Sequence, residues 1–573
     1  MSEKLYEYTE IKDLKDMLNK SGEKYGEKIA YQIKIEENKY KTYTHKEIRQ
    51  MINSLGTRLI ELGLKNKRIA IIGENRYEWE IAYLSIVCGT GIVVPIDKSL
   101  PQNELEKVIE RSEVEAIFCT EKYIETLKTI VNKGCGKLTT LISMDLEHHT
   151  DKIYSQKELI KEGKQLIEKG NRSFIDAEIN NEEMSVMLFT SGTTSDSKIV
   201  AISHKNLASN LMDIASILDI NSDDVFLSFL PLHHVFECTV GFLFSLYVGA
   251  KTVFSDGIRH IVENLNEYQV SVMASVPAIY ERIFKIIRKE MAKNGNLKEI
   301  LENEEKCKNS SMQEKKKIFK KIHDMLGGKI KILISGAASL DKEIEEKYRN
   351  LGLNLVQGYG LTETSPVIGI GTEKYHKIGS IGKTVPSVEA KIVNPNSDGI
   401  GELIARGPNI MLGYYQNEEA TNKAIIDGWF YTGDLARIDE EGYIFICGRK
   451  KNVIVLKNGK NIYPEEMENL LNKMDGVEES FIYGKPLSKD KENIKIYARI
   501  VYDKDIYKNQ NEKKLHDEFA ERIKEINRLM PKYKAIRGFT LTEEPLIKTT
   551  TNKLKRQQNL EKILKEEKES VRE

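Results

Sequence analysis

The sequence predicts an α/β protein whose large N-terminal domain is built on doubly wound sheets. Short apolar runs that suit buried parallel strands occur at 68–75 (RIAIIGEN), 91–96 (GIVVPI) and 114–120 (VEAIFCT). Segments with apolar residues at helical spacing lie between these runs, and such alternation is typical of a doubly wound sheet. The length of 573 residues exceeds what one hydrophobic core supports, so we expect two or more domains.

Individual helices can be placed from the spacing of their apolar residues. Residues 46–63 carry isoleucine, leucine and methionine at helical spacing and stop at Gly63. A second helix is expected at 102–112, and a third after Ser203, a residue type that favours the N-cap. The apolar stretch at 81–96 contains two glycines and is shorter than the ~20 residues that cross a bilayer. It therefore predicts a helix that leads into a buried strand.

Two later strands are expected at 331–336 (KILISG) and 353–360 (LNLVQGYG). Both run into loops that gather small and polar residues. Ligands of open α/β sheets bind at such strand ends, so these loops are candidate binding segments.

Composition limits the classes of function. Lys+Arg and Asp+Glu number 87 each, so the chain has no global basic field with which to hold nucleic acid. The six cysteines form no C-x-x-C pair, which favours free thiols in a reducing cytosol over disulfides or zinc. The N-terminus shows no signal peptide, and we expect a cytoplasmic protein.

The pattern changes along the chain and predicts its organisation. Residues 1–449 form the large domain, which includes a lysine-rich helical insertion at about 282–328 and a glycine-punctuated β-rich subdomain at about 380–447. Residues 450–573 mix strands and helices and form a small α+β domain. The lysines of the insertion form either a solvated face or a surface for weak peripheral contact with acidic lipid headgroups.

The most informative segment is FTSGTTSDSK at 189–198. Its hydroxyls, backbone N–H groups and terminal lysine suit a polyphosphate cradle. It is not the G-x-x-x-x-G-K-[ST] loop of P-loop NTPases, because the second glycine and the final hydroxyl are missing. The alternative is a Ser/Thr-rich surface turn.

Four further clusters accompany this loop, at 357–363 (QGYGLTE), 429–434 (WFYTGD), 448–464 (GRKKNVIVLKNGKNIYP) and 545–556 (PLIKTTTNKLKR). Each alone reads as an ordinary turn, loop or charged tail. In this order the five clusters closely resemble the adenylate-forming superfamily of acyl-CoA synthetases, luciferases and adenylation domains, over about residues 20–556. The subgroup that the chain resembles most is the bacterial long-chain fatty acyl-CoA synthetases, through segments 73–101, 228–237 (SFLPLHHVFE) and 275–284.

The resemblance implies a reaction in two steps. A fatty acid carboxylate attacks the α-phosphorus of ATP and releases pyrophosphate, and the thiol of CoA then displaces AMP from the acyl-adenylate. The first step brings two anions together and needs positive charge and donors in place beforehand. Mg²⁺ neutralises the phosphates and needs a hard carboxylate ligand.

The resemblance also implies roles for individual residues. Those assigned to the β,γ-phosphates are Thr190, Ser191, Gly192, Thr193, Thr194 and Lys198. Those assigned to the adenine and the strand end beside it are Gly336, Ala337, Ala338, Gln357, Gly358, Tyr359 and Gly360, with Tyr359 offering an aromatic face. Thr362 is assigned to the α-phosphate, Glu363 to Mg²⁺, and Asp434 with Arg449 to the ribose.

The remaining implied roles concern catalysis and domain movement. Lys553 matches the catalytic lysine that bridges the acyl carboxylate and the α-phosphate. The resemblance makes the small α+β domain at 450–573 a mobile lid. Lys451, or Lys450 beside it, occupies the hinge about which this lid domain rotates. His234 is placed near the acyl group, where packing or gating is favoured over metal binding with His233.

The chain departs from the family pattern at four positions. Ser195, Ser197 and Ile199 stand where glycine, proline and glycine are usual, and Asn552 precedes the catalytic lysine in place of glycine. Ile199 raises a concern about backbone geometry, because a β-branched side chain disfavours positive φ.

Alternative functions share part of this pattern. An acyl carrier protein in place of CoA, or a shorter or aryl acid in place of a fatty acid, fits the same first-step residues. An amino-acid-activating enzyme needs an acidic residue near 231–240, where only Glu237 lies. A non-catalytic nucleotide-binding relative is the alternative that is not an enzyme. The sequence carries no signal for the oligomeric state.

Overall fold

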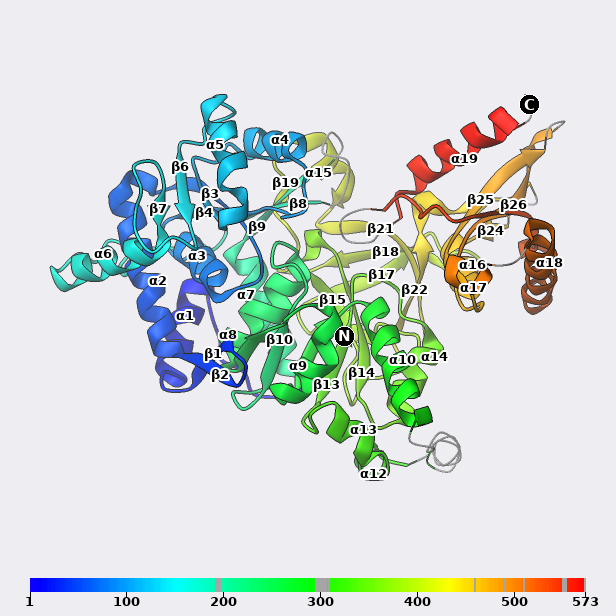
Figure 1. Ribbon diagram of the computed structural model, residues 1–573, viewed down its shortest axis with the longest axis horizontal. Helices are drawn as coiled ribbons and strands as arrows, with labels where there is room; N and C mark the ends of the chain where they lie inside the picture. Colours follow the sequence, from blue (N-terminus) through cyan, green and yellow to red (C-terminus); the bar gives the residue numbers. More distant parts are fainter. Residues whose placement is uncertain are drawn as a thin grey trace. The chain divides into compact units, whose positions relative to one another are not determined.

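The computed structural model describes residues 1–190, 197–293, 307, 310–457, 460–487, 490–508, 511–548 and 554–570 (Figure 1). The chain forms two compact units. Unit 1 comprises Met1–Ala390, Ala405–Phe430 and Asp439–Ile444, and unit 2 comprises Lys391–Ile404, Tyr431–Ile438 and Phe445–Glu573. The domain boundary expected near 449–450 stays a prediction.

The first sheet of unit 1 has eight strands with a parallel centre. In spatial order they are β19 (Gly413–Tyr414), β9 (Ile199–Ser203), β8 (Met184–Phe189), β4 (Gly91–Pro95), β3 (Lys67–Ile72), β5 (Ala116–Cys119), β6 (Thr140–Ser143) and β7 (Tyr154–Ser155). Strands β8 to β7 pair in parallel, while β9 and β19 pair antiparallel. The buried apolar strands expected at 68–75, 91–96 and 114–120 are β3, β4 and β5.

Among the described residues, five helices accompany this sheet, and the first three of them lie where the sequence analysis expects helices. They are α2 (His45–Leu59), α3 (Tyr77–Val87), α4 (Gln102–Ser112), α5 (Ile124–Asn132) and α6 (Gln156–Glu168). Helix α4 matches the expected range, and α3 leads into β4 as the 81–96 stretch predicts. After α2 a π-helical turn, Ile60–Leu64, contains Gly63 at φ +79, a left-handed conformation that glycine adopts without steric cost.

The second sheet of unit 1 has nine strands, again parallel at its centre. In spatial order they are β16 (Lys383–Thr384), β15 (Val367–Ile370), β14 (Leu355–Gly360), β13 (Ile332–Ser335), β12 (Val272–Ser275), β10 (Val225–Ser228), β11 (Lys251–Phe254), β1 (Ile29–Glu36) and β2 (Lys39–Thr44). Strands β14 to β1 pair in parallel, and antiparallel pairs close both edges. The prediction of doubly wound sheets is confirmed.

The helices associated with this sheet include one that becomes central to the site. They are α1 (Leu14–Lys24), α7 (His204–Ile217), α8 (Phe244–Val248), α9 (Ile261–Glu267), α10 (Pro277–Lys293), α12 (Met312–Ile318), α13 (Lys320–Met325) and α14 (Lys342–Asn350). Ser203 caps α7 by accepting the N–H of Asn206, and the Asn206 side chain bonds the Ser203 N–H in return. The apolar face predicted for this helix is buried.

The described part of the 282–328 insertion is helical, and it consists of the end of α10 together with α12 and α13. Residues 294–306 and 308–309 lie outside the described residues. None of the helices that the structure describes has the length and apolar content needed to span a bilayer.

Residues 389–449 carry a five-stranded sheet of short strands, as the glycine-punctuated pattern predicts. Its strands are β17 (Glu389–Val393), β18 (Gly401–Arg406), β21 (Trp429–Ile438), β20 (Ile425–Ile426) and β22 (Ile444–Arg449), with helix α15 (Glu418–Ala424) between β19 and β20.

The C-terminal part of unit 2 is α+β, as predicted. Its sheets contain β23 (Ile454–Val455) with β24 (Asn461–Ile462), and β25 (Val477–Leu487), β26 (Asp490–Tyr502) and β27 (Ile536–Thr542). Its helices are α16 (Pro464–Leu471), α17 (Lys504–Tyr507), α18 (Glu512–Leu529) and α19 (Arg556–Ser570). These elements enclose their own core, which includes Met467, Phe519 and Ile536.

Candidate functional site

The Ser/Thr-rich loop is the connection of a β-hairpin between β8 and β9. The N–H of Thr190 donates to the carbonyl of Lys198 at 2.9 Å, and the N–H of Lys198 donates to Oγ1 of Thr190 at 3.0 Å. These two bonds close the base of the loop. Ser191, Gly192, Thr193 and Thr194, together with Ser195, lie outside the described residues, so their roles stay predictions.

The concern about Ile199 is wrong. Ile199 opens β9, a strand that the sequence analysis missed, and it lies opposite Phe189 on β8. Its side chain is 5% exposed, and its strand backbone suits a β-branched residue. Ser197, the preceding departure, is also buried, and the guanidinium of Arg111 donates to its hydroxyl and its carbonyl.

Lys198 and Glu363 meet at a residue that the sequence analysis did not single out. Nζ of Lys198 lies 4.3 Å from the ring centroid of Tyr414, a cation–π contact. The hydroxyl of Tyr414 donates to Oε1 of Glu363 at 2.9 Å. Burial, and then the Glu363 charge, raise the pKa of Tyr414 above its usual range, so the phenol stays a donor. The only signal in the sequence is the aromatic pair in GYY at 413–415.

The backbone around Glu363 is fixed from several directions. Thr362 and Glu363 lie in a short 3₁₀ helix, Thr362–Thr364, directly after β14. The N–H of Met411 donates to the carbonyl of Glu363 at 2.9 Å. A Cβ at Gly360 would lie 1.7 Å from the carbonyl oxygen of Pro366, so only glycine fits where β14 ends.

Helix α7 ties this segment to the hairpin. The side-chain amide of Asn206 donates to the carbonyls of Pro408 and Ile410 at 2.7 and 2.8 Å. Asn210 exchanges hydrogen bonds with the backbone of Val367. Because α7 follows β9 directly, one helix positions both the lysine side and the carboxylate side of the cluster.

The two predicted strand-end segments also lie in unit 1. Gly336 to Ala338 follow β13, with Ala337 left-handed at φ +65. A Cβ at Gly336 would lie 2.8 Å from the ring of Phe236, so glycine allows this aromatic ring to approach. Phe236 belongs to the same segment as His234, whose Nδ1 accepts the Phe236 N–H at 3.3 Å.

Gln357, one of the predicted ligand residues, has a side chain that is bonded within the fold, and its role at the nucleotide stays a prediction. Its amide donates to Oε2 of the fully buried Glu345 at 2.9 Å and accepts the N–H of Leu340. Gly358, Tyr359 and Gly360 follow it on β14 and are partly buried.

Unit 2 holds the candidate ribose residues. Asp434, which is 3% exposed, lies on β21, and its Oδ1 pairs with Nε of Arg449 at 2.8 Å. Beside it, Oε1 of Glu402 accepts the N–H of Gly433, and Oε2 of Glu402 pairs with Nζ of Lys450 at 2.7 Å. Lys451 is exposed in the 3₁₀ turn Lys450–Asn452 that follows β22. Lys553 and Asn552 lie outside the described residues.

Glu363 is the candidate residue whose chemistry suits a metal ion. A carboxylate such as Glu363 is a hard oxygen ligand of the kind that Mg²⁺ takes when phosphates and water supply the other ligands. Within the described residues no group of three or more His, Cys, Asp or Glu side chains gathers to hold a metal. The single carboxylate of Glu363 therefore suits a magnesium ion whose remaining ligands come from phosphate and water.

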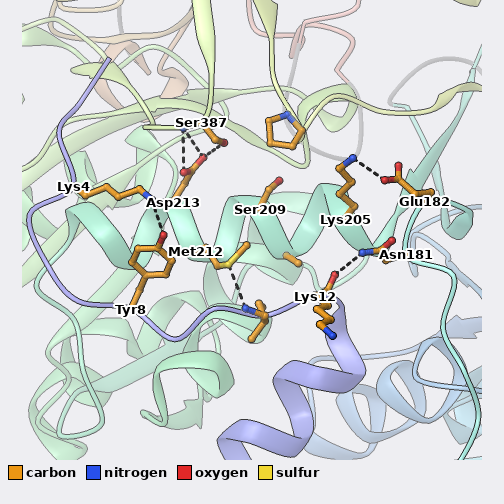
Figure 2. A pocket seen from close by; sticks show the side chains of 13 residues that line it. Lys4, Tyr8, Lys12, Asn181, Glu182, Lys205, Ser209, Met212, Asp213 and Ser387 are labelled. Atoms are coloured by element: carbon orange, nitrogen blue, oxygen red, sulfur yellow. Dashed lines mark hydrogen bonds and ion pairs between the residues drawn. The ribbon is translucent and has the colours of Figure 1, made fainter.

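A cavity of about 340 Å³ lies on unit 1 between the N-terminal segment and α7, and none of the candidate residues lines it (Figure 2). Buried Asp213 accepts the N–H of Ser387 there, and burial raises its pKa to about 6. On the rim, Lys4 contacts Tyr8 and Lys205 pairs with Glu182.

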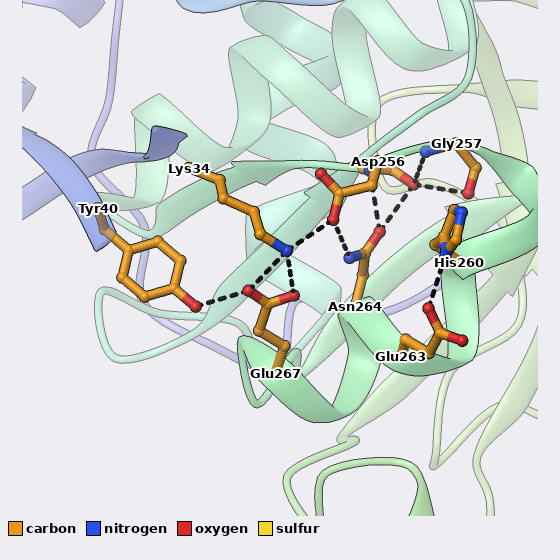
Figure 3. A network of polar contacts seen from close by, with 9 residues as sticks. Lys34, Tyr40, Asp256, Gly257, His260, Glu263, Asn264 and Glu267 are labelled. Atoms are coloured by element: carbon orange, nitrogen blue, oxygen red, sulfur yellow. Dashed lines mark hydrogen bonds and ion pairs between the residues drawn. The ribbon is translucent and has the colours of Figure 1, made fainter. Parts of the chain in front are cut away.

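A polar network joins β1 and β2 to the segment after β11 (Figure 3). Nζ of Lys34 lies 3.0 Å from carboxylate oxygens of Asp256 and Glu267, and Tyr40 donates to Glu267. Asn264 bonds Asp256 from α9. Each carboxylate is thus engaged by donors from neighbouring elements, which indicates a structural role in fixing the sheet edge.

This chain is similar to known proteins along most of its length. The model of the AMP-binding enzyme family matches residues 18–415, and that of the AMP-binding enzyme C-terminal domain matches residues 451–568. Fatty acyl-CoA synthetase B of Dictyostelium discoideum is 32% identical over 83% of this chain and 75% of its own length. Long chain acyl-CoA synthetase 3 of Arabidopsis thaliana is 28% identical over 78% and 72% of the two chains.

Solved structures show the same fold. ATP-bound MatB from Rhodopseudomonas palustris superimposes with a TM-score of 0.73 at 23% identity, over 96% of this chain and 98% of its own. The match of the family model over more than half of the sequence, together with this fold, establishes that the chain belongs to the AMP-binding enzyme family.

Proposed function

We propose that the protein is an ATP-dependent, AMP-forming ligase that joins a long-chain fatty acid to CoA. The observation that carries the proposal is the convergence of Lys198 and Glu363 on Tyr414. An ammonium and a carboxylate held apart by a neutral phenol suit a polyphosphate with its magnesium ion. The relatives named fatty acyl-CoA synthetase B and long chain acyl-CoA synthetase 3 support the choice of fatty acid and CoA.

In the first step Lys198 and the hydroxyl of Thr190 bind the departing phosphates, and Thr362 contacts the α-phosphate. Their donors stabilise the charge that develops as the carboxylate attacks. Glu363 would hold Mg²⁺, and the ion would neutralise part of the phosphate charge. The remaining hydroxyls of the loop, Ser191, Thr193 and Thr194, are proposed to complete the cradle around Gly192.

Adenosine recognition is divided among the other candidates. Gly336, Ala337 and Ala338 leave room for a flat base against the face of Tyr359. In unit 2 the carboxylate of Asp434 accepts the ribose hydroxyls, and its bond to Arg449 orients it. Lys553 acts at the α-phosphate, and Lys451 serves as the hinge for the second half-reaction.

The acyl group is assigned to the segment that carries His234. This segment begins beyond β10 and leads into a π-helical turn, Glu237–Leu243. Glu237 is 1% exposed and accepts the hydroxyl of Ser228 at 2.6 Å, and burial raises its pKa to about 8. Because this carboxyl is buried and already bonded to Ser228, it is not exposed to the amine of an amino acid, which favours an uncharged acyl chain over that alternative.

The test is AMP release and pyrophosphate exchange over acids from acetate to oleate, with CoA and acyl carrier protein compared as acceptors. We expect the highest kcat/KM with acids of 14 or more carbons, at roughly a thousandfold or more above butyrate, because each buried CH₂ contributes about 0.8 kcal/mol and such an acid carries ten more of them. Activity confined to short or aryl acids contradicts the chain-length assignment. Absence of AMP with every acid contradicts the ligase assignment.

A further inference from the structure

The departure at Ser197 has a partner on another element. Ser197 is 5% exposed, and Arg111 reaches it from the last turn of α4. Nη1 of Arg111 donates to the Ser197 hydroxyl at 3.0 Å, and Nη2 donates to the Ser197 carbonyl at 2.6 Å. A planar guanidinium makes two such bonds in a fixed geometry, which a lysine cannot do.

Arg111 also contacts the strand that enters the loop. Its Cζ lies 5.6 Å from the ring centroid of Phe189, the last residue of β8. One side chain therefore touches the residue before Thr190 and the residue before Lys198. It contacts both arms of the hairpin, close to the base of the Ser/Thr loop.

The contact to the Ser197 carbonyl acts directly on Lys198. The carbonyl of Ser197 and the N–H of Lys198 belong to one planar peptide unit. Arg111 binds the oxygen of this unit, and Thr190 Oγ1 accepts its N–H at 3.0 Å. Because both polar atoms of the peptide are held, the orientation from which the Lys198 side chain leaves the backbone toward Tyr414 is fixed.

We propose that Arg111 is a positioning residue for ATP binding, which sets the direction of Lys198 by holding the 197–198 peptide through Ser197. This inference rests on the proposed role of Lys198 at the phosphates. It explains how a buried serine at this position is compatible with a working phosphate lysine: the arginine supplies the fixation of the backbone. The residues involved come from positions 111, 190 and 197–198, which only the fold brings together.

The variants separate the two bonds. Arg111→Ala removes both, and we expect the Kd for MgATP to rise roughly 5- to 20-fold, less than the full worth of two charge-assisted hydrogen bonds, because the change reaches ATP only through the direction of Lys198. Ser197→Ala removes only the hydroxyl bond, and a rise of about 2- to 3-fold is expected. Arg111→Lys keeps the charge with a single point contact and lies between them. The double variant should match Arg111→Ala within about twofold, because the two sites act through one contact.

The readout is the Kd for MgATP from calorimetry, with the KM of the acid and the melting temperature measured beside it. Arg58→Ala is the matched control, since it deletes a partly buried arginine of α2. Nε of Arg58 pairs with Oε2 of Glu162 on α6 at 2.7 Å. We expect this control to lower the melting temperature without changing the Kd. If Arg111→Ala destabilises the protein too far to purify, Arg111→Lys carries the same measurement.

An unchanged Kd in Arg111→Ala or, failing that variant, in Arg111→Lys overturns the proposal, as does an equal change of Kd in Arg58→Ala. A rise in the KM of the acid as large as the rise in Kd for MgATP also overturns it, because a general loss of packing then accounts for both. Failure of the proposed function looks different. The wild type then forms no AMP with any acid, while MgATP binding still depends on Arg111.

Discussion

The charged cluster of unit 1 and that of unit 2 differ in how their charges are neutralised. In unit 1, no ion pair joins Lys198 to Glu363 within the described part of the chain, and the neutral phenol of Tyr414 contacts both. In unit 2, Asp434 pairs with Arg449 and Glu402 pairs with Lys450. The unit 2 cluster is electrostatically complete by itself, whereas the unit 1 cluster holds opposite charges that a phosphate and its metal can meet.

This difference predicts which measurement each cluster controls. Removing a buried carboxylate from an ion pair lowers stability, by an amount that solvent screening at the exposed partner limits. Removing a charge that has no protein counterion costs little stability and mainly weakens the binding of the ligand. Substitutions in unit 1 should therefore change kinetics, and those in unit 2 should change stability together with nucleotide affinity.

The largest effect on the rate of adenylate formation is expected at Lys553. Such an effect would show that unit 2 contributes to catalysis as well as to nucleotide binding. Lys553→Ala should slow adenylate formation about 10²- to 10³-fold, the cost of removing one preorganised charge from a transition state. Thioester formation from preformed acyl-adenylate should persist. Lys555→Ala, two residues on, is the control. Equal loss of both half-reactions would contradict the assignment.

Glu363→Gln tests the unit 1 cluster directly. Glutamine keeps an acceptor for Tyr414 but removes the charge that binds Mg²⁺, so kcat should fall about 10²-fold with little change in melting temperature. The matched variant is Glu402→Gln in unit 2. Because Lys450 is largely exposed, that change should cost no more than about 1 kcal/mol of stability and leave kcat within about threefold. A reversal of these two profiles would refute the contrast between the clusters.

Asp434→Asn tests the unit 2 cluster. Asp434 is buried but Arg449 is 40% exposed, so solvent screens the pair and the free energy of unfolding should fall by only about 1–2 kcal/mol. The loss of an acceptor for the ribose hydroxyls should raise the KM for ATP about tenfold. Arg449→Lys retains the charge and serves as the control. If Asp434→Asn lowers stability with the KM for ATP unchanged, Asp434 is a structural residue only.

Local patterns carried most of the fold, and distant contacts carried most of what was missed. Helix α4 and the Ser203 cap depend on residues within one or two turns, so spacing and cap chemistry placed them. Strand β9 was missed because its five residues lie between a loop and a helix cap, and its pairing with β8 supplies the missing signal. The misjudgement of Ile199 followed from that omission.

The candidate site shows the same division. Short motifs indicated Thr190, Lys198 and Glu363, whose chemistry is visible in the residue types. They did not indicate Tyr414, which lies 51 positions from Glu363, or Arg111, which lies 86 positions from Ser197. They also did not reveal that Gln357 serves Glu345, because a side chain's partner depends on the packing of α14 against β14.

The smallest expected effect tests the phenol that distinguishes the unit 1 cluster. Tyr414→Phe removes the donor to Glu363 but leaves the ring under Lys198, so kcat/KM for MgATP should fall about 3- to 10-fold, the net worth of one ordinary hydrogen bond. Tyr415→Phe is the control, because the Tyr415 hydroxyl bonds Arg68 within the fold and should affect stability alone. Equal kinetic effects from the two tyrosines would make Tyr414 an ordinary packing residue. A larger loss in Tyr414→Leu than in Tyr414→Phe would show that the ring positions Lys198 independently of the hydroxyl. In that case the ring positions Lys198 and the hydroxyl orients Glu363, so that one tyrosine places both charges for the phosphate ligand.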